Sequence, residues 1–360
     1  MFVLFCAFLF KLGPPAPKFT HNVANDYKDQ RLNSFIENYL DNYDVVCLQE
    51  MFGAFSGRRK RLIREARKRG FLWKVSSAQN RSSMYLVDGG CLILSKVKIV
   101  SEAFHVFPPG IMSDRLAAKG VIYAKLNPKP NVYVHLFVTH LQAVYSDSSS
   151  MKECMNIQRI QYDSLADFVL STVAENESSD DMLLARFQDT LPPVQQHFSP
   201  VRRWPIIVSG DFNCNSRPAP GDLVNQTTRP YKHLCESLAK ISPNFSDVLF
   251  DQLGEHPVTY ASAKFALNGS FFPHETALTS PSDYHESAEW VNQCLDYLFL
   301  FPPEHVVHPE TLAVHDPVLK TIDAGVKHLQ YVPAHNEPRS VHGLVYLSDH
   351  WALEAAFDIL

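Results

Sequence analysis

The chain of 360 residues is 46% hydrophobic and 20% charged, and its formal net charge at pH 7 is −5. The hydrophobic fraction can fill a sizeable core, and the balance of charges excludes an intrinsically disordered chain. The net negative charge argues against a protein that binds by neutralising many DNA phosphates, so no nucleic-acid partner is expected, although a local basic patch remains compatible with it.

The chain opens with an apolar stretch over residues 2–10, followed by the sequence PPAP at 14–17. As a helix, the stretch is too short to span a bilayer, and it lacks the basic start and the clear cleavage site of a signal peptide. A weak signal peptide, the remnant of a membrane anchor and an edge strand are all compatible with it. Because the prolines form a stiff break, we predict a leader or anchor remnant over 1–18 and one domain over 19–360.

Two further features bear on the compartment. Sequons of the type N-x-S/T lean towards a secretory route. They begin at Asn80, Asn176, Asn225, Asn244 and Asn268. The seven cysteines show no paired spacing, so they indicate neither a disulfide framework nor a zinc site.

Two helices are predicted in the first part of the chain. The first is amphipathic, and its apolar face consists of Leu32, Phe35, Ile36, Tyr39 and Leu40. The second carries eight Arg or Lys residues between positions 58 and 69. That basic helix is compatible with a solvated outer face, with adsorption to anionic lipid headgroups or, as a third choice, with a nucleic-acid contact.

Several short apolar runs that read as strands lead directly into polar side chains. The runs and the residues that follow them are 44–48 with Glu50, 132–138 with His140, and 205–209 with the sequence GDFN at 210–213. Buried strands place their last residues at the rim of a core, where a rigid scaffold can aim several side chains into one cleft. The polar residues are therefore predicted to form one site.

The residue types in this set favour metal-assisted attack of water on a phosphate ester. The carboxylate of Glu50 and the amides of Asn22 and Asn213 are hard oxygen ligands of the kind that Mg²⁺ prefers. His140 and His350 supply two imidazoles for proton transfer or hydrogen bonding. Each motif alone is compatible with an ordinary turn or a surface histidine, and it is their joint occurrence at strand ends that favours the functional interpretation.

The remaining chain is predicted to contain a helix over 157–170 and a polar surface loop over 175–203. A second excursion over 256–290 carries aromatic residues among Gly, Ser and Pro, including Phe271 and Phe272. Its aromatic rings either pack inward or form a lipid-facing hairpin.

This constellation resembles the endonuclease/exonuclease/phosphatase superfamily from about residue 19 to the C-terminus. The residues that carry the resemblance are Asn22, Glu50, His140, Asp211, Asn213, Asp296, Asp349 and His350. The sequences VVCLQEMF, DGGCLILSK, DRLAAKG, THLQA and SGDFN look like its neutral sphingomyelinase branch. The resemblance implies an α/β fold, the DNase I-like four-layer α/β sandwich of two packed mixed β-sheets flanked by helices.

The resemblance also implies roles for the metal and the base. Glu50 and Asn22 would hold Mg²⁺, with Mn²⁺ as a substitute. His350 would take a proton from the attacking water. Its tautomer would be fixed by an acceptor such as Asp211 or a neighbouring carboxylate.

The other residues would act around this centre. Asn213 and His140 would donate hydrogen bonds to the transition state, where preorganised donors are worth a few kcal/mol each, in order of magnitude. Asp296 and Asp349 would orient the imidazoles. The implied activity is that of a magnesium-dependent phosphodiesterase of phospholipase C type that hydrolyses sphingomyelin to ceramide and phosphocholine.

A regulatory pair is implied as well. DRLAAKG places Asp114 and Lys119 at the spacing of the Asp/Lys switch pair of membrane-bound neutral sphingomyelinases. The alternative is a simple surface ion pair, worth under about 1 kcal/mol.

Partners and rivals follow from the same resemblance. The expected partner is a membrane lipid, with an anionic lipid surface as a docking site, so we expect membrane association; the side of the membrane and the oligomeric state stay open. One rival function is that of another superfamily phosphoesterase, either an inositol polyphosphate phosphatase or a nuclease. The other is a catalytically silent membrane-binding module on the same fold.

Overall fold

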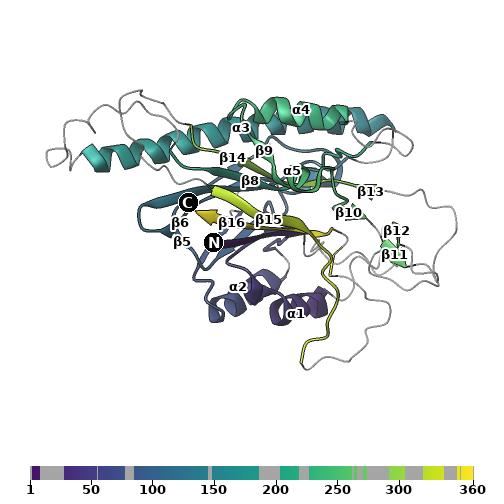
Figure 1. Ribbon diagram of the computed structural model, residues 1–360. Coiled ribbons are helices and arrows are strands. Elements are labelled where there is room, and N and C mark those ends of the chain that lie inside the picture. Colours follow the sequence, from purple (N-terminus) through teal and green to yellow (C-terminus); the bar gives the residue numbers. More distant parts are fainter. Residues whose placement is uncertain are drawn as a thin grey trace.

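A computed structural model describes residues 2–8, 28–54, 56–77, 85–144, 148–185, 203–218, 227–261, 263–265, 271–273, 292–304, 319–335, 347–348 and 350–359. Two predicted site residues, Asn22 and Asp349, lie outside these residues. Two sheets stack face to face between two outer layers of helices (Figure 1). The predicted four-layer α/β sandwich is therefore confirmed.

Each main sheet has six strands. In spatial order, sheet 1 consists of β15 (Leu319–Lys327), β16 (Ala352–Ile359), β1 (Phe2–Phe8), β2 (Val45–Gln49), β4 (Leu92–Ser95) and β3 (Trp73–Ser76). Sheet 2 consists of β5 (Lys98–Val106), β6 (Gly120–Lys129), β7 (Val132–His140), β8 (Ile206–Asp211), β14 (Asp296–Phe301) and β9 (Ser246–Asp247). Both sheets are mixed, because β1 and β2 run parallel in one and β7 and β8 in the other.

Helices cover the outer faces of the two sheets. The helices α1 (Lys28–Asn38) and α2 (Arg58–Lys68) lie below sheet 1 in Figure 1, and α3 (Ser148–Ala185) and α4 (Arg229–Leu238) lie above sheet 2. The short helix α5 (Val248–Leu253) follows β9, and two 3₁₀ turns, η2 (Leu40–Asn42) and η3 (Met112–Leu116), complete the set. No helix among the described residues is long and apolar enough to cross a membrane.

Alternate residues along a buried strand pack into two different hydrophobic cores, one on each face of the sheet. In β2, Val45 and Cys47 belong to the core between the sheets, whereas Val46 and Leu48 belong to the core with α1 and α2. Side chains of a strand alternate between the two faces of its sheet, so a strand that is buried on both sides must be apolar throughout. Full burial of such a side chain contributes roughly 1.5–3 kcal/mol. This is why the predicted strand runs lie at the centre of the sandwich.

The apolar N-terminal segment forms a strand inside sheet 1. Phe2–Phe8 pairs antiparallel with β16 and parallel with β2. Of the three interpretations of this segment, a strand is the one observed, although β1 has a neighbour on each side and is not an edge strand. The division between 1–18 and 19–360 stays a prediction.

The structure corrects one predicted connection and describes part of another. Helix α3 continues to Ala185, so the prediction of a loop from residue 175 is wrong up to that point. The cause is the sequence of 175–185, which contains Glu, Met, Leu and Ala but neither Gly nor Pro, and so favours a helix. The excursion over 256–290 contains the strand β10 (Tyr260–Ala261) and a hairpin of β11 (Ala263–Phe265) with β12 (Phe271–Pro273), and β13 (Asn292–Gln293) follows it to pair with β10.

Candidate active site

Polar side chains from both sheets meet at one end of the sandwich. Glu50 follows β2, His140 and Asp211 end β7 and β8, and Asp296 begins β14. Since β8 lies between β7 and β14, Asp211 is in register with both His140 and Asp296. His350 enters just before β16.

Except for Asp296, these residues line a cleft of about 610 Å³. Its lining includes Glu50, Asp114, Lys119, His140, Asp211, Asn213, Tyr260, Gln293 and His350. All the predicted site residues that the structure describes are thus in the cleft lining, except Asp296, which contacts His350.

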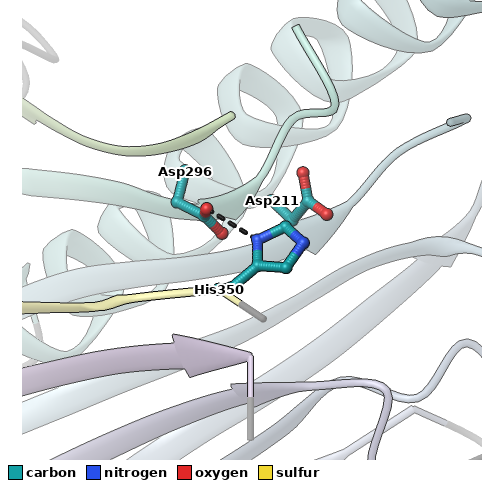
Figure 2. Close-up of side chains that lie close together, drawn as sticks. All are labelled: Asp211, Asp296 and His350. Atoms are coloured by element: carbon teal, nitrogen blue, oxygen red, sulfur yellow. Dashed lines mark hydrogen bonds and ion pairs between the residues drawn. The ribbon is translucent and has the colours of Figure 1, made fainter. Parts of the chain in front are cut away.

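Asp296 holds the imidazole of His350. The Nδ1 and Oδ2 atoms are 2.9 Å apart, and both side chains are buried (Figure 2). Because an ionised carboxylate can only accept, Nδ1 carries the proton and Nε2 of the neutral ring is an acceptor. The backbone N–H of Asp296 donates to Thr259 Oγ1 at 3.1 Å, which fixes the start of β14. In this arrangement His350 is able to take a proton.

Asp211 is a second buried carboxylate beside this pair. One ligand atom each from Asp211, Asp296 and His350 lie within 4.8 Å of one another. Burial, followed by repulsion from Asp296, raises the pKa of Asp211 to about 8. The backbone N–H of Asn213 donates to Asp211 Oδ1 at 2.6 Å. Asp211 therefore stands in an environment that disfavours its negative charge.

His140 is a neutral neighbour of Asp211. Its Nε2 lies 3.7 Å from Asp211 Oδ2, which is too long for a hydrogen bond. Burial lowers the pKa of His140 well below 6.5, and the charges of Lys119 and His350 lower it further. At neutral pH the ring is therefore uncharged and has one N–H to donate.

Two cleft residues have left-handed backbone conformations. The φ angles are 56° at Glu50 and 50° at Asn213. Asn tolerates this region far better than Glu, and such outliers cluster at functional sites. Asn213 Nδ2 donates to the backbone carbonyl of Leu141 at 2.9 Å, and Gln158 Nε2 donates to the carbonyl of Asn213 at 2.7 Å. The Asn213 loop is thus fixed from both sides.

The donor set fits a hard divalent cation such as Mg²⁺. The carboxylates of Glu50 and Asp211 and the amide of Asn213 line the same cleft and offer the oxygen ligands that Mg²⁺ prefers. A cation here would also offset the unfavourable burial that raises the pKa of Asp211. Asn22, the other predicted ligand, lies outside the described residues.

Asp114 and Lys119 form an ion pair in the cleft wall. Lys119 Nζ lies 3.0 Å from Asp114 Oδ2, and the two side chains are only 6% and 13% exposed, respectively. Lys119 Nζ also donates to the carbonyl of Leu141 at 2.7 Å, and the N–H of Ala143 donates to Asp114 Oδ2 at 2.7 Å. The pair is therefore largely buried rather than exposed to solvent. The regulatory role of this pair stays a prediction.

The sequence analysis missed residues that hydrogen-bond to the backbone around the site. Gln158 lies on α3 and Thr259 just before β10, and neither belongs to a recognised motif. Both Gln158 and Gln161 fall within the predicted helix, and the structure shows that both are buried. Two polar residues on the inward face of that helix were the available signal. Gln161 Oε1 accepts the N–H of Gln142 at 2.8 Å, so both side chains satisfy backbone groups of the cleft loops.

Comparison with known proteins identifies the family. Residues 19–350 match the model of the endonuclease/exonuclease/phosphatase family. The chain belongs to this family. A sphingomyelinase of Dictyostelium discoideum is 30% identical over 320 residues, which cover 79% of this chain and 62% of that protein. The chain thus spans about 62% of the length of this relative.

Two other proteins are similar to this chain in sequence or in structure. Sphingomyelinase C of Bacillus cereus is 34% identical over 117 residues, 29% of this chain and 34% of that protein. The beta toxin of Staphylococcus aureus superposes over 99% of both chains with a TM-score of 0.57 and 20% identity. A double variant of that toxin with bound magnesium ions covers 98% of both chains with a TM-score of 0.56 and 20% identity. The resemblance to the sphingomyelinase branch is confirmed, and the structural likeness shows the DNase I-like fold.

Proposed function

We propose that the protein is a magnesium-dependent phosphodiesterase of phospholipase C type that hydrolyses sphingomyelin to ceramide and phosphocholine. The observation that carries this proposal is one cleft in which His350, held by Asp296, lies beside the carboxyl groups of Asp211 and Glu50. Likeness to the sphingomyelinases of D. discoideum and B. cereus supports the substrate class. The magnesium ions in the S. aureus toxin variant support the choice of cation.

His350 would act as the general base. Its Nε2 takes a proton from a water molecule whose oxygen forms a bond to phosphorus, while the bond from phosphorus to the ceramide oxygen breaks. The departing alkoxide gains a proton from solvent, so the products are an alcohol and a phosphomonoester. The contact between Asp296 and Nδ1 keeps the accepting nitrogen free of a proton before the reaction and stabilises the imidazolium that forms.

Fixed donors would stabilise the charge that develops on the phosphoryl oxygens. In its neutral state His140 has one ring N–H to donate, and the Asn213 amide has a second N–H besides the one bound to Leu141. Removing one such donor costs roughly 10²–10³ in kcat.

Glu50 and Asn22 would hold the cation, with Asp211 close by, and Mn²⁺ would serve as a substitute for Mg²⁺. When bound, the cation supplies Lewis-acid polarisation of a phosphoryl oxygen. The cleft residues in turn orient the diester and fix the direction from which water approaches.

A substrate that stays in a bilayer requires an apolar surface near the cleft mouth. Val144 and Met151 line the cleft and are exposed, and Met112 and Leu116 are exposed on η3, which carries Asp114. These four side chains, here called the apolar rim, support docking on lipid. Hydrogen bonds from Ile111 N to Gln142 Oε1 and from Ala143 N to Asp114 Oδ2 join η3 to the segment before Val144.

The basic helix α2 is a weaker candidate than the apolar rim for the surface that binds lipid. Arg58 and Arg61 pair with Asp29, and Arg64 and Lys68 pair with Glu65. Exposed pairs of this kind contribute little to stability, but Asp29 and Glu65 offset two of these four positive charges and so weaken the field that would attract anionic lipid.

One experiment separates the proposed function from its rivals. The purified protein is assayed with Mg²⁺ against labelled sphingomyelin, an inositol polyphosphate and plasmid DNA in parallel. Release of phosphocholine that stops in excess chelator is the expected result. Preference for the polyphosphate or for DNA would indicate the other phosphoesterases, and no turnover of any of the three, with vesicle binding intact, would indicate a silent binding module.

A further inference from the structure

The backbone at Glu50 must be held by its surroundings. A φ of 56° costs any residue other than glycine free energy and persists only where neighbouring structure fixes it. The N–H of the next residue, Met51, donates to the carbonyl of Gly90 at 2.8 Å. This bond ties residues 51–53 to the sequence DGG at 88–90. Whatever fixes these two segments against each other also fixes Glu50.

Asp88 makes that connection. Its Oδ2 accepts the N–H of Gly53 at 2.8 Å, and its Oδ1 accepts the N–H of Gly90 at 2.9 Å. Arg59 Nη1, from the first turn of α2, donates to the same Oδ1 at 3.0 Å. Asp88 is 4% exposed and Arg59 is 7% exposed, so each is a buried charge that depends on the other for its partner.

Two glycines fit closely into this arrangement. A Cβ at Gly53 would overlap the guanidinium of Arg59. A Cβ at Gly90, whose φ is 72°, would lie only 3.0 Å from the Cα of Glu50. The missing side chains therefore allow Arg59 to reach Asp88 and the DGG backbone to press against Glu50.

We propose that Arg59 and Asp88 act as a clamp that positions Glu50 and so sets the affinity of the cleft for a divalent cation. Neither residue is among those that line the cleft, so both are positioning residues that act through Glu50. The inference rests on the proposed function, in which Glu50 holds the cation. Mg²⁺ demands near-ideal octahedral geometry with ligands at 2.0–2.1 Å, so a small displacement of one carboxylate weakens binding.

The test measures Mg²⁺ binding directly on the full-length chain by isothermal titration calorimetry. Asp88→Asn keeps the shape of the side chain but removes the charge that pairs with Arg59. We expect its Kd for Mg²⁺ to rise at least tenfold, while kcat at saturating Mg²⁺ on a soluble choline phosphodiester stays within about threefold. Arg59→Lys, which keeps the charge but not the planar fork, should give a smaller rise.

A matched control variant destabilises the fold without changing Arg59 or Asp88. Leu62 lies one turn after Arg59 on α2 and is fully buried in the core between sheet 1 and the helices α1 and α2. Leu62→Ala should lower the Tm through a cavity and leave the Kd for Mg²⁺ within twofold. In the double variant Asp88→Asn/Glu50→Gln, the loss of affinity should not exceed that of Glu50→Gln alone, because the clamp acts only through Glu50.

The outcomes separate the clamp from the proposed function. If Glu50→Gln weakens Mg²⁺ binding but Asp88→Asn and Arg59→Lys keep the wild-type Kd, the clamp is refuted and the metal role of Glu50 stands. If Asp88→Asn does not fold, Arg59→Lys decides by the same criterion. If the wild-type chain binds no Mg²⁺, the proposed function fails and the clamp fails with it.

Discussion

A single hydrogen bond decides which nitrogen of His350 can take a proton. Nδ1 faces Asp296 Oδ2 at 2.9 Å, and both groups are buried where water cannot replace the contact. Because this bond fixes the tautomer before the substrate reacts, no rearrangement of the ring proton is needed during the reaction. In the proposed mechanism Asp296 therefore contributes to the chemistry although it does not line the cleft.

Replacing this carboxylate tests the role of His350 as base. Asp296→Asn keeps the shape but can turn an NH₂ group towards Nδ1, which forces the ring proton onto Nε2. We expect kcat to fall by roughly 10³–10⁴, with the Kd for Mg²⁺ little changed. His350→Ala should be as severe, and combining both changes should add little further loss. Steady-state kinetics of the three variants make the comparison, and near-normal kcat in either single variant would contradict the assignment.

The pKa of Asp211 predicts how stability depends on pH. In the unfolded chain the carboxyl ionises near 3.8, whereas burial keeps its proton in the folded state up to about pH 8. Between these values the folded state binds more protons, so the free energy of unfolding falls as the pH rises. The lowered pKa of His140 has the opposite effect below about 6.5, which leaves the fall clearest between pH 6.5 and 8.

Urea unfolding across that range, in chelator, measures the effect. We expect the wild-type chain to lose stability with rising pH and Asp211→Asn to lose much less, because the amide does not ionise. Added Mg²⁺ should flatten the wild-type curve, since a cation favours the carboxylate. An identical slope in both proteins would show that other groups cause the dependence.

Sequence alone predicts which residues approach the cleft but not how they pair. Glu50, His140 and Asp211 follow apolar strand runs, and that pattern is visible in a single sequence. The sequence leaves the partner of His350 open between Asp211 and another carboxylate. The choice depends on the antiparallel register of β14 with β8, which brings together residues far apart in the chain.

At the scale of elements, α2 shows how an amphipathic pattern can be hidden by charge. Its run of Arg and Lys reads as a solvated face, yet Arg59 is buried together with Leu62 and Ala66. These residues are spaced at i, i+3 and i+7, the spacing of one helical face. An Arg in register with the apolar stripe was the available signal, but only the fold places Asp88 opposite it.

The turn η3 connects the apolar rim to the cleft through Asp114. Asp114→Ala would leave Lys119 as an uncompensated charge in the cleft wall and remove the acceptor of the Ala143 N–H. We expect hydrolysis of sphingomyelin in vesicles to fall at least tenfold, while the Kd for Mg²⁺ stays unchanged. Titration calorimetry and a vesicle assay make the two measurements.

A matched control for this change exists on α3. Asp163 forms an exposed ion pair with Lys240, and Asp163→Ala should leave vesicle hydrolysis within about twofold. If Asp114→Ala hydrolyses sphingomyelin in vesicles at the wild-type rate, its ion pair with Lys119 is only a structural contact. If the Kd for Mg²⁺ rises, the pair acts on the cation site.

At the scale of the whole molecule, the cleft and the basic helix lie in different layers. The cleft lies at the strand ends near β10 and β13, whereas α2 covers the outer face of sheet 1 (Figure 1). A bilayer that reaches the cleft therefore meets the apolar rim first. The hairpin of β11 and β12, which contains Phe271 and Phe272, extends on the same side of the molecule (Figure 1).

This arrangement predicts membrane binding that depends little on salt. Charge attraction weakens as the Debye length shortens from ~8 Å at physiological ionic strength to ~3 Å at 1 M, whereas insertion of apolar side chains does not. We expect co-sedimentation with sphingomyelin-containing vesicles, with or without phosphatidylserine, to change less than threefold across a salt series. Charge reversal at Arg61 and Arg64 should matter less than the loss of apolar surface, because Asp29 and Glu65, each of which pairs with two basic residues, partly offset their charge.

Loss of apolar surface should have the larger effect. Met112→Ser/Leu116→Ser and, separately, Phe271→Ala/Phe272→Ala should each weaken vesicle binding at least tenfold, about 1.4 kcal/mol, because fewer apolar groups enter the bilayer interface. Leu170→Ser is the matched control, since Leu170 is exposed on α3 away from the cleft lining. Salt-sensitive binding that is lost on charge reversal would instead assign docking to α2. No vesicle binding under any condition, together with rapid hydrolysis of a soluble phosphate ester, would favour a phosphatase over a lipid phosphodiesterase.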